Sequence, residues 1–384
     1  MVSNALKSCI WNTPINLNDK NRSILLYVEG AFNLKMREKM PSRAKTADGI
    51  LRYAQYKVAG VIDSQCKKTD VSTILKINKD VPIFKTIQEA KEKTNANTLI
   101  VGIAPEGGQL PESFLKDLYW ALENGLDIVS GMHTPVCSFP QLKKIAEKGK
   151  RKIWETRIPP ENLPLASCRA YQIKKPIVLT VGTDAAIGKL TATYELVKMA
   201  KNKGLKPCLI PTGQTAIMIE GWGITVDKCE GDFMAGAVEK MILEKEKENP
   251  DIYFVEGQGS LFHPAYSTTS LALIHGSCPT HMVLVHRPQR KRITGCQLLP
   301  LPEIKNAICA YEKSVLPNFR NTKVVAIALN TQGLEEKQAK KIIKKIERET
   351  GLPTTDLIRW PHSSPRLIGG QATGKKDWTD LFIK

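Results

Sequence analysis

Residues 177–191, IVLTVGTDAAIGKLT, decide the fold of this chain. The apolar, β-branched run Ile177–Val181 predicts a buried strand, and the residues after Lys189 have the periodicity of a helix with one apolar face. A glycine-rich loop between a strand and a helix is typical of a phosphate-binding loop, because its backbone N–H groups and the helix N-terminus converge on an anion. Lys189 adds a positive charge at the same point, so the stretch predicts an α/β fold and a phosphorylated ligand.

The loop departs from the common pattern G-x-x-x-x-G-K-[ST] in two ways. Five residues, not four, separate Gly182 from Gly188, and Leu190 stands where a hydroxyl usually coordinates Mg²⁺. Thr191 or Asp184 could supply that ligand instead, and a tight strand-to-helix turn without a ligand is the alternative interpretation. The residues that we expect to contact the cofactor are Gly182, Thr183, Asp184, Ala185, Ala186, Ile187, Gly188, Lys189, Leu190 and Thr191.

A second apolar strand pattern, DIYFVEGQGS at 251–260, ends in an acid and a glycine-rich turn. Glu256 stands where an acid accompanies a phosphate loop, and there it can hold a metal, a water or a substrate amine; capping of the following turn is the alternative. His263 follows closely, either as a general base or as a hydrogen-bonded loop histidine. We predict Glu256, His263 and Lys189 as catalytic residues, with Thr191 and Glu256 as metal ligands if Mg-ATP is used.

Strand and helix signals alternate twice along the chain, which predicts two doubly wound parallel sheets. We expect an N-terminal domain at 23–155 and a C-terminal domain at 177–360, joined by a proline-rich linker at 156–176. Residues 1–22 form a polar lead-in, and we expect a loosely ordered tail at 361–384. The strand signals lie at 24–28, 58–63, 98–104 and 127–131 in the first half, and at 177–181, 207–211, 251–256, 280–286 and 323–329 in the second.

Composition narrows the class of protein. The 384 residues are 42% hydrophobic, and no apolar run approaches the roughly 18 residues that span a bilayer. Because there is no secretory signal pattern, we expect a cytoplasmic protein. The nine cysteines form no C-x-x-C pair, which argues against zinc and against a disulfide framework, and we expect no haem.

The net charge of +18 raises the question of nucleic-acid binding. The basic residues are spread along the chain, however, and the densest segment, 335–349, is an amphipathic helix pattern with a solvated basic face. The cluster at 287–292 could hold phosphates or be plain surface. We therefore expect a small-molecule substrate and a homo-oligomer, with no nucleic acid and no membrane as partners.

Four residues outside the loop are predicted to contact the substrate. Gln214 and Thr215 follow a strand end that we expect to face the phosphate loop, and His133 stands at a strand end in the first domain. Arg287 follows another strand, where its guanidinium suits a substrate carboxylate.

The segments GTDAAIGK at 182–189 and VEGQGS at 255–260 resemble dethiobiotin synthetase and its phosphate-loop relatives. That resemblance implies that Glu256 lies at the metal and the substrate diamine. The segment KVVAIALNT at 323–331 is similar to a strand of that family whose asparagine contacts adenine, which implies the same role for Asn330.

A closer resemblance, from about Ser23 to Arg359, is to the DgcN-like family, long catalogued as a domain of unknown function. It implies an N-terminal Rossmann-like domain, a C-terminal P-loop NTPase-like domain, and N-acetylation of D-glutamate with acetyl-CoA; the family also tolerates a residue without a hydroxyl at Leu190. The motifs that carry it are GIAPEGG at 102–108, SGMHTP at 130–135, VGTDAAIGK at 181–189, PTGQTAIMIEG at 211–221, VEGQGSLFHP at 255–264 and LVHR at 284–287.

Several functions stay open from the sequence. The first is an N-acyltransferase that uses acetyl-CoA and acts on a small acidic amino acid, with glycine N–H groups at 257–259 as oxyanion donors. The second is a Mg-ATP-dependent ligase or carboxylase, so the cofactor is acetyl-CoA or ATP, with Mg²⁺ possible. A non-catalytic nucleotide-binding protein is the third, and a nucleic-acid binder, which rests only on charge, ranks last.

Overall fold

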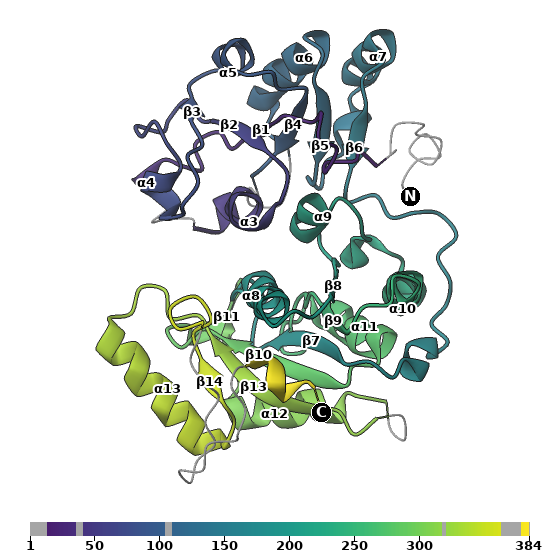
Figure 1. Ribbon diagram of the computed structural model, residues 1–384, viewed down its shortest axis with the longest axis vertical. Helices are drawn as coiled ribbons and strands as arrows, with labels where there is room; N and C mark the ends of the chain where they lie inside the picture. The colour runs from purple at the N-terminus through teal and green to yellow at the C-terminus, as the bar shows by residue number, and fades with distance from the viewer. Residues whose placement is uncertain (1–13, 36–40, 104–109, 317–319, 362–377, 384) are drawn as a thin grey trace. The chain divides into compact units, whose positions relative to one another are not determined.

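The chain folds into two compact units of the α/β class (Figure 1). Unit 1 comprises Met1–Pro159 and Gln214–Thr225, and unit 2 comprises Pro160–Gly213 and Val226–Lys384. The prediction of two doubly wound parallel sheets is confirmed. The computed structural model describes residues 14–35, 41–103, 110–316, 320–361 and 378–383.

The sheet of unit 1 has six parallel strands in the order β3-β2-β1-β4-β5-β6. Its central strands are continuous apolar runs, as expected for a sheet that is covered on both faces. The strands are β1 (Ile24–Tyr27), β2 (Val58–Ile62), β3 (Ile83–Phe84), β4 (Thr98–Val101), β5 (Asp127–Ser130) and β6 (Ile153–Glu155). Sequence periodicity missed β3 and β6, because two or three residues are too few to set a pattern.

The helices of unit 1 lie on both faces of this sheet. Figure 1 shows α5, α6 and α7 on one side and α3 on the other, as right-handed crossovers from the central strands require. The helices are α3 (Lys45–Tyr53), α4 (Ser72–Leu75), α5 (Ile87–Lys93), α6 (Leu115–Glu123), α7 (Pro140–Gly149) and α9 (Gln214–Glu220), with 3₁₀ turns η1 (Pro41–Ala44), η3 (Glu112–Phe114) and η4 (Val136–Ser138). The helix α9 comes from just past the midpoint of the sequence and packs against α3.

A buried carboxylate fixes the ends of β1 and β2. Asp63, directly after β2, accepts backbone N–H groups from Gly30, Gln65 and Cys66 at Oδ1 and from Phe32 at Oδ2, all within 3.1 Å. Burial raises the pKa of this carboxyl, whereas the N–H donors lower it. An acid at this position of a dinucleotide-binding fold would bind a ribose, but these oxygens are already occupied by the chain's own backbone.

The sheet of unit 2 also has six parallel strands, in the order β14-β13-β10-β7-β9-β8. The strand β7 lies in the interior between β10 and β9, and its six residues are all buried. The connection after β7 leads toward β9 and β8, whereas the connection after β10 leads the other way, toward β13 and β14, so the loop after β7 lies at the switch point where parallel sheets bind ligands. The strands are β7 (Ile177–Gly182), β8 (Pro207–Ile210), β9 (Ile252–Val255), β10 (His281–His286), β13 (Lys323–Leu329) and β14 (Thr354–Thr355).

The helices of unit 2 cover both faces of its sheet. Right-handed crossovers place α8 on one face of the sheet and α10, α11 and α12 on the other. The elements are α8 (Lys189–Asn202), α10 (Met234–Glu246), α11 (Ser267–Ser277), α12 (Ile304–Lys313) and α13 (Glu336–Thr350), the hairpin β11 (Arg292–Ile293) and β12 (Cys296–Pro300), and the 3₁₀ turns η5 (Arg169–Gln172), η6 (Val226–Lys228), η7 (Gly231–Phe233) and η8 (Trp378–Leu381).

The expected linker and tail both contain packed residues. Within 156–176, the backbone of the segment before β7 is held by Glu239 of α10, whose carboxylate accepts the N–H groups of Ser167 and Arg169. At the end of the expected loose tail, Trp378 and Phe382 are buried, and the Phe382 ring meets Phe254 edge-on at 6.0 Å. The apolar side chains of these last residues anchor the segment on unit 2; residues 362–377 lie outside the described part.

Candidate functional site

The loop after β7 has the strand–loop–helix order that the sequence predicts. The strand ends at Gly182, and α8 begins at Lys189. Gly188 has φ +110°, a backbone conformation that L-residues rarely adopt, and Ala186 has φ +49°. Within the loop, Ile187 is buried, Ala185, Gly188, Leu190 and Thr191 are half-buried, and Ala186 is exposed. The exposed and half-buried positions are the surface that the loop offers to a ligand.

Lys189 is buried, with a relative exposure of 6%. Its Nζ donates a hydrogen bond to the backbone oxygen of Asp184 at 2.9 Å. Burial lowers the pKa of Lys189 to about 8; the carboxylates of Asp184 and Glu256 oppose this shift, and the Arg290 guanidinium adds to it. Lys189 is therefore positively charged below about pH 8 and neutral above it. A bound anion would favour the charged form again.

Asp184 ties the loop to the segment that follows β10. Its fully buried carboxylate accepts the Ala185 N–H at 2.7 Å on Oδ1. Oδ2 accepts Arg290 Nη1 at 2.8 Å and both the backbone N–H and the hydroxyl of Thr294 at 2.9 Å. Arg290 also donates to the Ala185 carbonyl. With four donors on its two oxygens, this carboxylate is poorly placed to bind Mg²⁺.

Glu256 directly follows β9, the strand beside β7, and is almost fully buried. Its Oε2 accepts the backbone N–H groups of Thr212 at 3.0 Å and Gly213 at 2.9 Å, and the Thr212 hydroxyl at 3.3 Å. The glutamate thus caps the chain after β8, which is a different turn from the one that the sequence analysis considered. The negative charge of Glu256 acts to raise the pKa of Lys189, against the effect of burial.

Gly257 allows the two strand ends to approach each other. A Cβ at this position would lie 1.7 Å from the Thr180 carbonyl oxygen and 3.0 Å from Lys189 Cδ. The Gly257 N–H donates to Thr180 Oγ1 at 2.9 Å. Only glycine fits at this point of VEGQGS, and its N–H is already used within the protein.

Tyr311, on α12, is a residue of this site that the sequence analysis missed. Its buried hydroxyl donates to the Gly182 carbonyl at 2.7 Å and accepts the Leu261 N–H at 3.2 Å. Thr294 was missed as well. No local pattern marks either residue, because each reaches the loop from a distant part of the sequence.

His263 has both ring nitrogens engaged. Nδ1 accepts the Ala265 N–H at 3.2 Å, so the proton lies on Nε2, which is 2.9 Å from the Thr294 carbonyl oxygen and donates to it. The ring is buried and stacks on Tyr266 with centroids 4.3 Å apart. Of the two interpretations of His263, this geometry favours a hydrogen-bonded loop histidine over a general base, because a general base needs a free lone pair.

Asn330 and Thr183 also lie at the loop. Asn330 Nδ2 donates to the Ile187 carbonyl at 3.1 Å, and the Thr183 hydroxyl lies 2.9 Å from His286 Nδ1. Burial, with a smaller contribution from Lys291, lowers the pKa of His286 to about 4, so this imidazole is neutral near pH 7.

Arg287, which directly follows β10, is half-buried. Burial and the neighbouring Arg290 guanidinium lower its pKa. Over the described ranges no hydrogen bond to the Arg287 guanidinium is found. A cation in this position is suited to bind an anionic ligand group.

Gln214 and Thr215 begin α9 and belong to unit 1. Gln214 Oε1 accepts a hydrogen bond from Arg157 Nη1 at 2.9 Å, and Thr215 Oγ1 lies 3.1 Å from Thr46 Oγ1. The motif PTGQTAIMIEG therefore crosses from unit 2 into unit 1 at Gln214, and these two side chains bind partners of unit 1. His133 is exposed after β5 in the same unit. The motif GIAPEGG is described only at residues 102–103.

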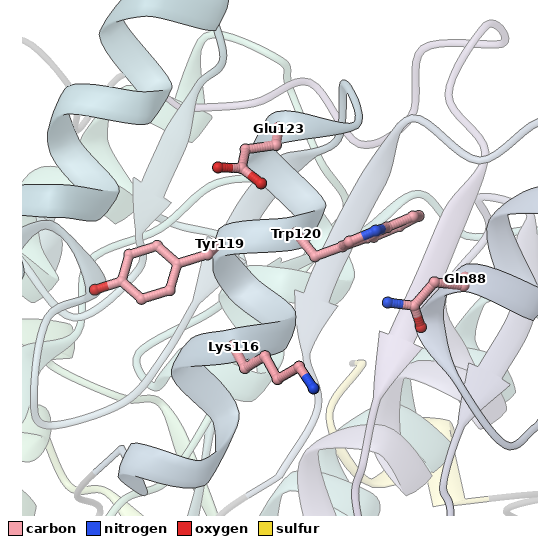
Figure 2. Close-up of a pocket in the computed structure, with 5 residues that line it drawn as sticks. All are labelled: Gln88, Lys116, Tyr119, Trp120 and Glu123. Carbon is pink, nitrogen blue, oxygen red and sulfur yellow. The ribbon is translucent and has the colours of Figure 1, made fainter.

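A hollow of about 370 Å³ on unit 1 contains none of the predicted site residues (Figure 2). It lies against α6 and α5, and Trp120 and Tyr119 give it an aromatic lining. The side chains around it are Gln88, Lys116, Tyr119, Trp120 and Glu123. In the described part of the chain, no group of three or more His, Cys, Asp or Glu residues could hold a metal ion, and no helix is long and apolar enough to cross a membrane.

Two family models match the chain. The P-loop domain of unknown function DUF1611_C matches residues 164–364, and the Rossmann-like domain of unknown function DUF1611_N matches residues 64–159. A crystal structure of a DUF1611 family protein from Anabaena variabilis is similar, with 38% identity and a TM-score of 0.81, over 88% of this chain and 96% of that chain.

Two curated relatives carry the same name. A D-glutamate N-acetyltransferase of Tritonibacter scottomollicae is 34% identical over 287 residues, which are 75% of this chain and 84% of the relative. A D-glutamate N-acetyltransferase of a Pseudoalteromonas species is 33% identical over 267 residues, which are 70% of this chain and 79% of the relative.

The role of Asp184 can be tested with Asp184→Ala. Without the carboxylate, Arg290 and Thr294 lose charge-assisted hydrogen bonds worth about 1.5–3 kcal/mol each, so the segment 287–300 should open more often. We expect trypsin to cleave after Arg290, Lys291 or Arg292 at least about tenfold faster than in the wild type. The control is Glu336→Ala, which removes only an exposed ion pair with Lys340. Equal cleavage rates in all three proteins would contradict the assignment.

The pKa of Lys189 predicts how anion binding depends on pH. We expect the affinity for ADP, whose phosphates stay fully ionised above neutral pH, to fall about tenfold per pH unit above pH 8, as the ammonium form is lost. Isothermal titration calorimetry from pH 7 to pH 10 measures this. Lys189→Met should bind weakly at every pH, whereas Lys198→Met, an exposed lysine of the same helix, should follow the wild type. A flat wild-type profile refutes the role of Lys189.

Proposed function

The chain belongs to the DUF1611 family, and on that premise we propose that it is an enzyme that transfers an acetyl group from acetyl-CoA to the amine of a small acidic amino acid. The observation that carries this proposal is 34% identity, over 75% of the chain, with a protein named D-glutamate N-acetyltransferase. The geometry of the phosphate loop supports it in two ways. The loop offers positive charge to an anionic ligand, and the acids near it are hydrogen-bonded within the protein.

Acetyl-CoA brings a pyrophosphate, which the loop can hold through backbone N–H groups, the N-terminus of α8 and Lys189. The acids near this loop are engaged by the protein: Asp184 by four donors, and Glu256 at Oε2 by three. Leu190 also lacks the hydroxyl that Mg²⁺ uses in the common loop. These features favour binding of the pyrophosphate without a metal, and we assign the adenine ring of the cofactor to the side of the loop where Asn330 lies.

In the proposed reaction, a base removes a proton from the substrate ammonium, and the amine nitrogen attacks the thioester carbonyl. A C–N bond forms, an oxyanion develops on the carbonyl oxygen, and the C–S bond then breaks to release CoA thiolate, which takes up a proton. We assign the base to Glu256, whose carboxylate follows β9 and acts on the charge of Lys189. Arg287 is our candidate for a substrate carboxylate.

The oxyanion needs hydrogen-bond donors that the protein does not itself use. The Gly257 N–H donates to Thr180, so we assign this role to the N–H groups of Gln258 and Gly259 in the same turn. Lys189 is positively charged below about pH 8 and adds electrostatic stabilisation of the developing negative charge.

An assay of thiol release tests the reaction. The protein is incubated with acetyl-CoA and either D- or L-glutamate in the presence of EDTA, and free CoA is measured with a thiol reagent. We expect release with one isomer, none without amino acid, and the same rate after Mg²⁺ is added. No thiol release, together with Mg²⁺-dependent formation of ADP from ATP, would instead establish the ligase alternative.

The variant Glu256→Gln tests the base. Glutamine keeps an oxygen that can accept the Thr212 and Gly213 N–H groups, so the fold should be preserved while the proton acceptor is lost. We expect kcat to fall about 10²- to 10⁴-fold with little change in the dissociation constant of acetyl-CoA. Glu244→Gln, on the exposed part of α10, is the control. Full activity of Glu256→Gln would mean that another residue is the base.

A further inference from the structure

One stripe of α6 carries two aromatic rings between charges of opposite sign. Its four members are spaced i, i+3, i+4 and i+7, which places them on one face of the helix. Lys116 and Glu123 are exposed at the two ends, and Tyr119 and Trp120 are half-buried between them. Figure 2 shows this order along α6, with the charged side chains at the ends and the rings in the middle. We call these four residues the α6 stripe.

The rings of the α6 stripe border the hollow of about 370 Å³ on unit 1, which Gln88 of α5 lines as well. Tyrosine and tryptophan side chains bury large apolar areas, and half-buried rings leave part of that area in water. Protein interfaces concentrate aromatic residues at their centre and charged residues at their rim. The α6 stripe has both features within two turns of one helix.

The two charges of the stripe do not pair with each other. Seven residues of helix separate them by about 10.5 Å along the axis, with the aromatic rings between them. Among residues 14–35, 41–103, 110–316, 320–361 and 378–383, no ion pair or hydrogen bond of the Lys116 or Glu123 side chain is found. Both charges are therefore available to a surface from outside the chain.

We propose that the α6 stripe is an interface between two copies of this chain, whose α6 helices pack antiparallel about a two-fold axis. The axis passes midway between Lys116 and Glu123, which is the point between Tyr119 and Trp120. A two-fold axis at this point exchanges the ends of the stripe, as in any isologous contact. Lys116 of each copy then lies opposite Glu123 of the other, and the rings meet at the centre.

The order of charges along the stripe selects a second copy as the occupant. When the helix is reversed end to end, its positive and negative ends become complementary to those of the original, whereas a parallel pair would place like charges opposite each other. The hollow beside the stripe gives room for an aromatic side chain of the other copy. A small aromatic ligand would fill the hollow, but charges two helical turns apart are too distant for one such molecule to neutralise both. This interface is independent of the phosphate loop and of the reaction proposed above.

Charge reversal tests the interface on the full-length protein, with sedimentation equilibrium as the measurement. We expect the wild type to dimerise at micromolar concentration. Lys116→Glu places glutamate opposite glutamate at both ends of the interface, and Glu123→Lys places lysine opposite lysine. Each variant should raise the dissociation constant of the dimer at least about tenfold, because two ion pairs are lost and two repulsions replace them. Both side chains are exposed, so the fold should be preserved, and circular dichroism checks this.

Two rescues separate direct pairing from a general loss of association. The double variant Lys116→Glu with Glu123→Lys should dimerise as the wild type does, because the opposite charges face each other again. An equal mixture of the two single variants should also form dimers, because one copy then carries glutamate at both positions and the other carries lysine at both.

The control is Lys337→Glu, an exposed position on α13 of unit 2, which should associate like the wild type. A monomeric wild type would overturn the proposal, and it would leave the hollow to another occupant. Unchanged association of both single variants would place the contact between copies on a different face. Failure of the mixed single variants to form dimers would likewise contradict the antiparallel pairing.

Discussion

The carboxylate of Asp184 is the constraint on which the rest of the candidate site depends. It accepts hydrogen bonds from Arg290 and Thr294, and so it joins the loop after β7 to the segment after β10. The Thr294 carbonyl in turn fixes His263 in the turn after β9. Three loops that are far apart in sequence are thus held by one buried anion, and removal of that anion would leave the half-buried Arg290 guanidinium without its carboxylate partner.

The same arrangement explains why Lys189 is not neutralised inside the protein. Asp184 accepts hydrogen bonds from Arg290, and Glu256 accepts the N–H groups of Thr212 and Gly213, so both carboxylates also serve other donors than the lysine. Burial then lowers the pKa of Lys189 to about 8. A bound anion would offset that desolvation, which supports our proposal that the loop binds a phosphorylated ligand although Leu190 replaces the usual hydroxyl.

Elements with a strong period or a long apolar run were predictable from the sequence, and those that lack them were not. The strand β7, the loop and α8 follow each other as VGTDAAIGK indicates, because a buried strand, glycines and an amphipathic helix each leave a local signal. The helix α11 was missed because its apolar residues lie on all sides. Likewise, nothing in the motif PTGQTAIMIEG indicates that the chain leaves unit 2 at Gln214 and forms α9 within unit 1.

The sequence by itself determined the fold class, the place of the phosphate loop, the strand end at Glu256 and the neighbourhood of Asn330, because each is a local pattern with a local physical cause. Only the tertiary structure decided which donors each polar group meets. It engaged both nitrogens of His263 and bound Gln214 and Thr215 to partners in unit 1. Hydrogen bonds and desolvation depend on contacts between distant residues, and therefore the pKa of Lys189 and the use of each carboxylate could not be read from the order of the amino acids.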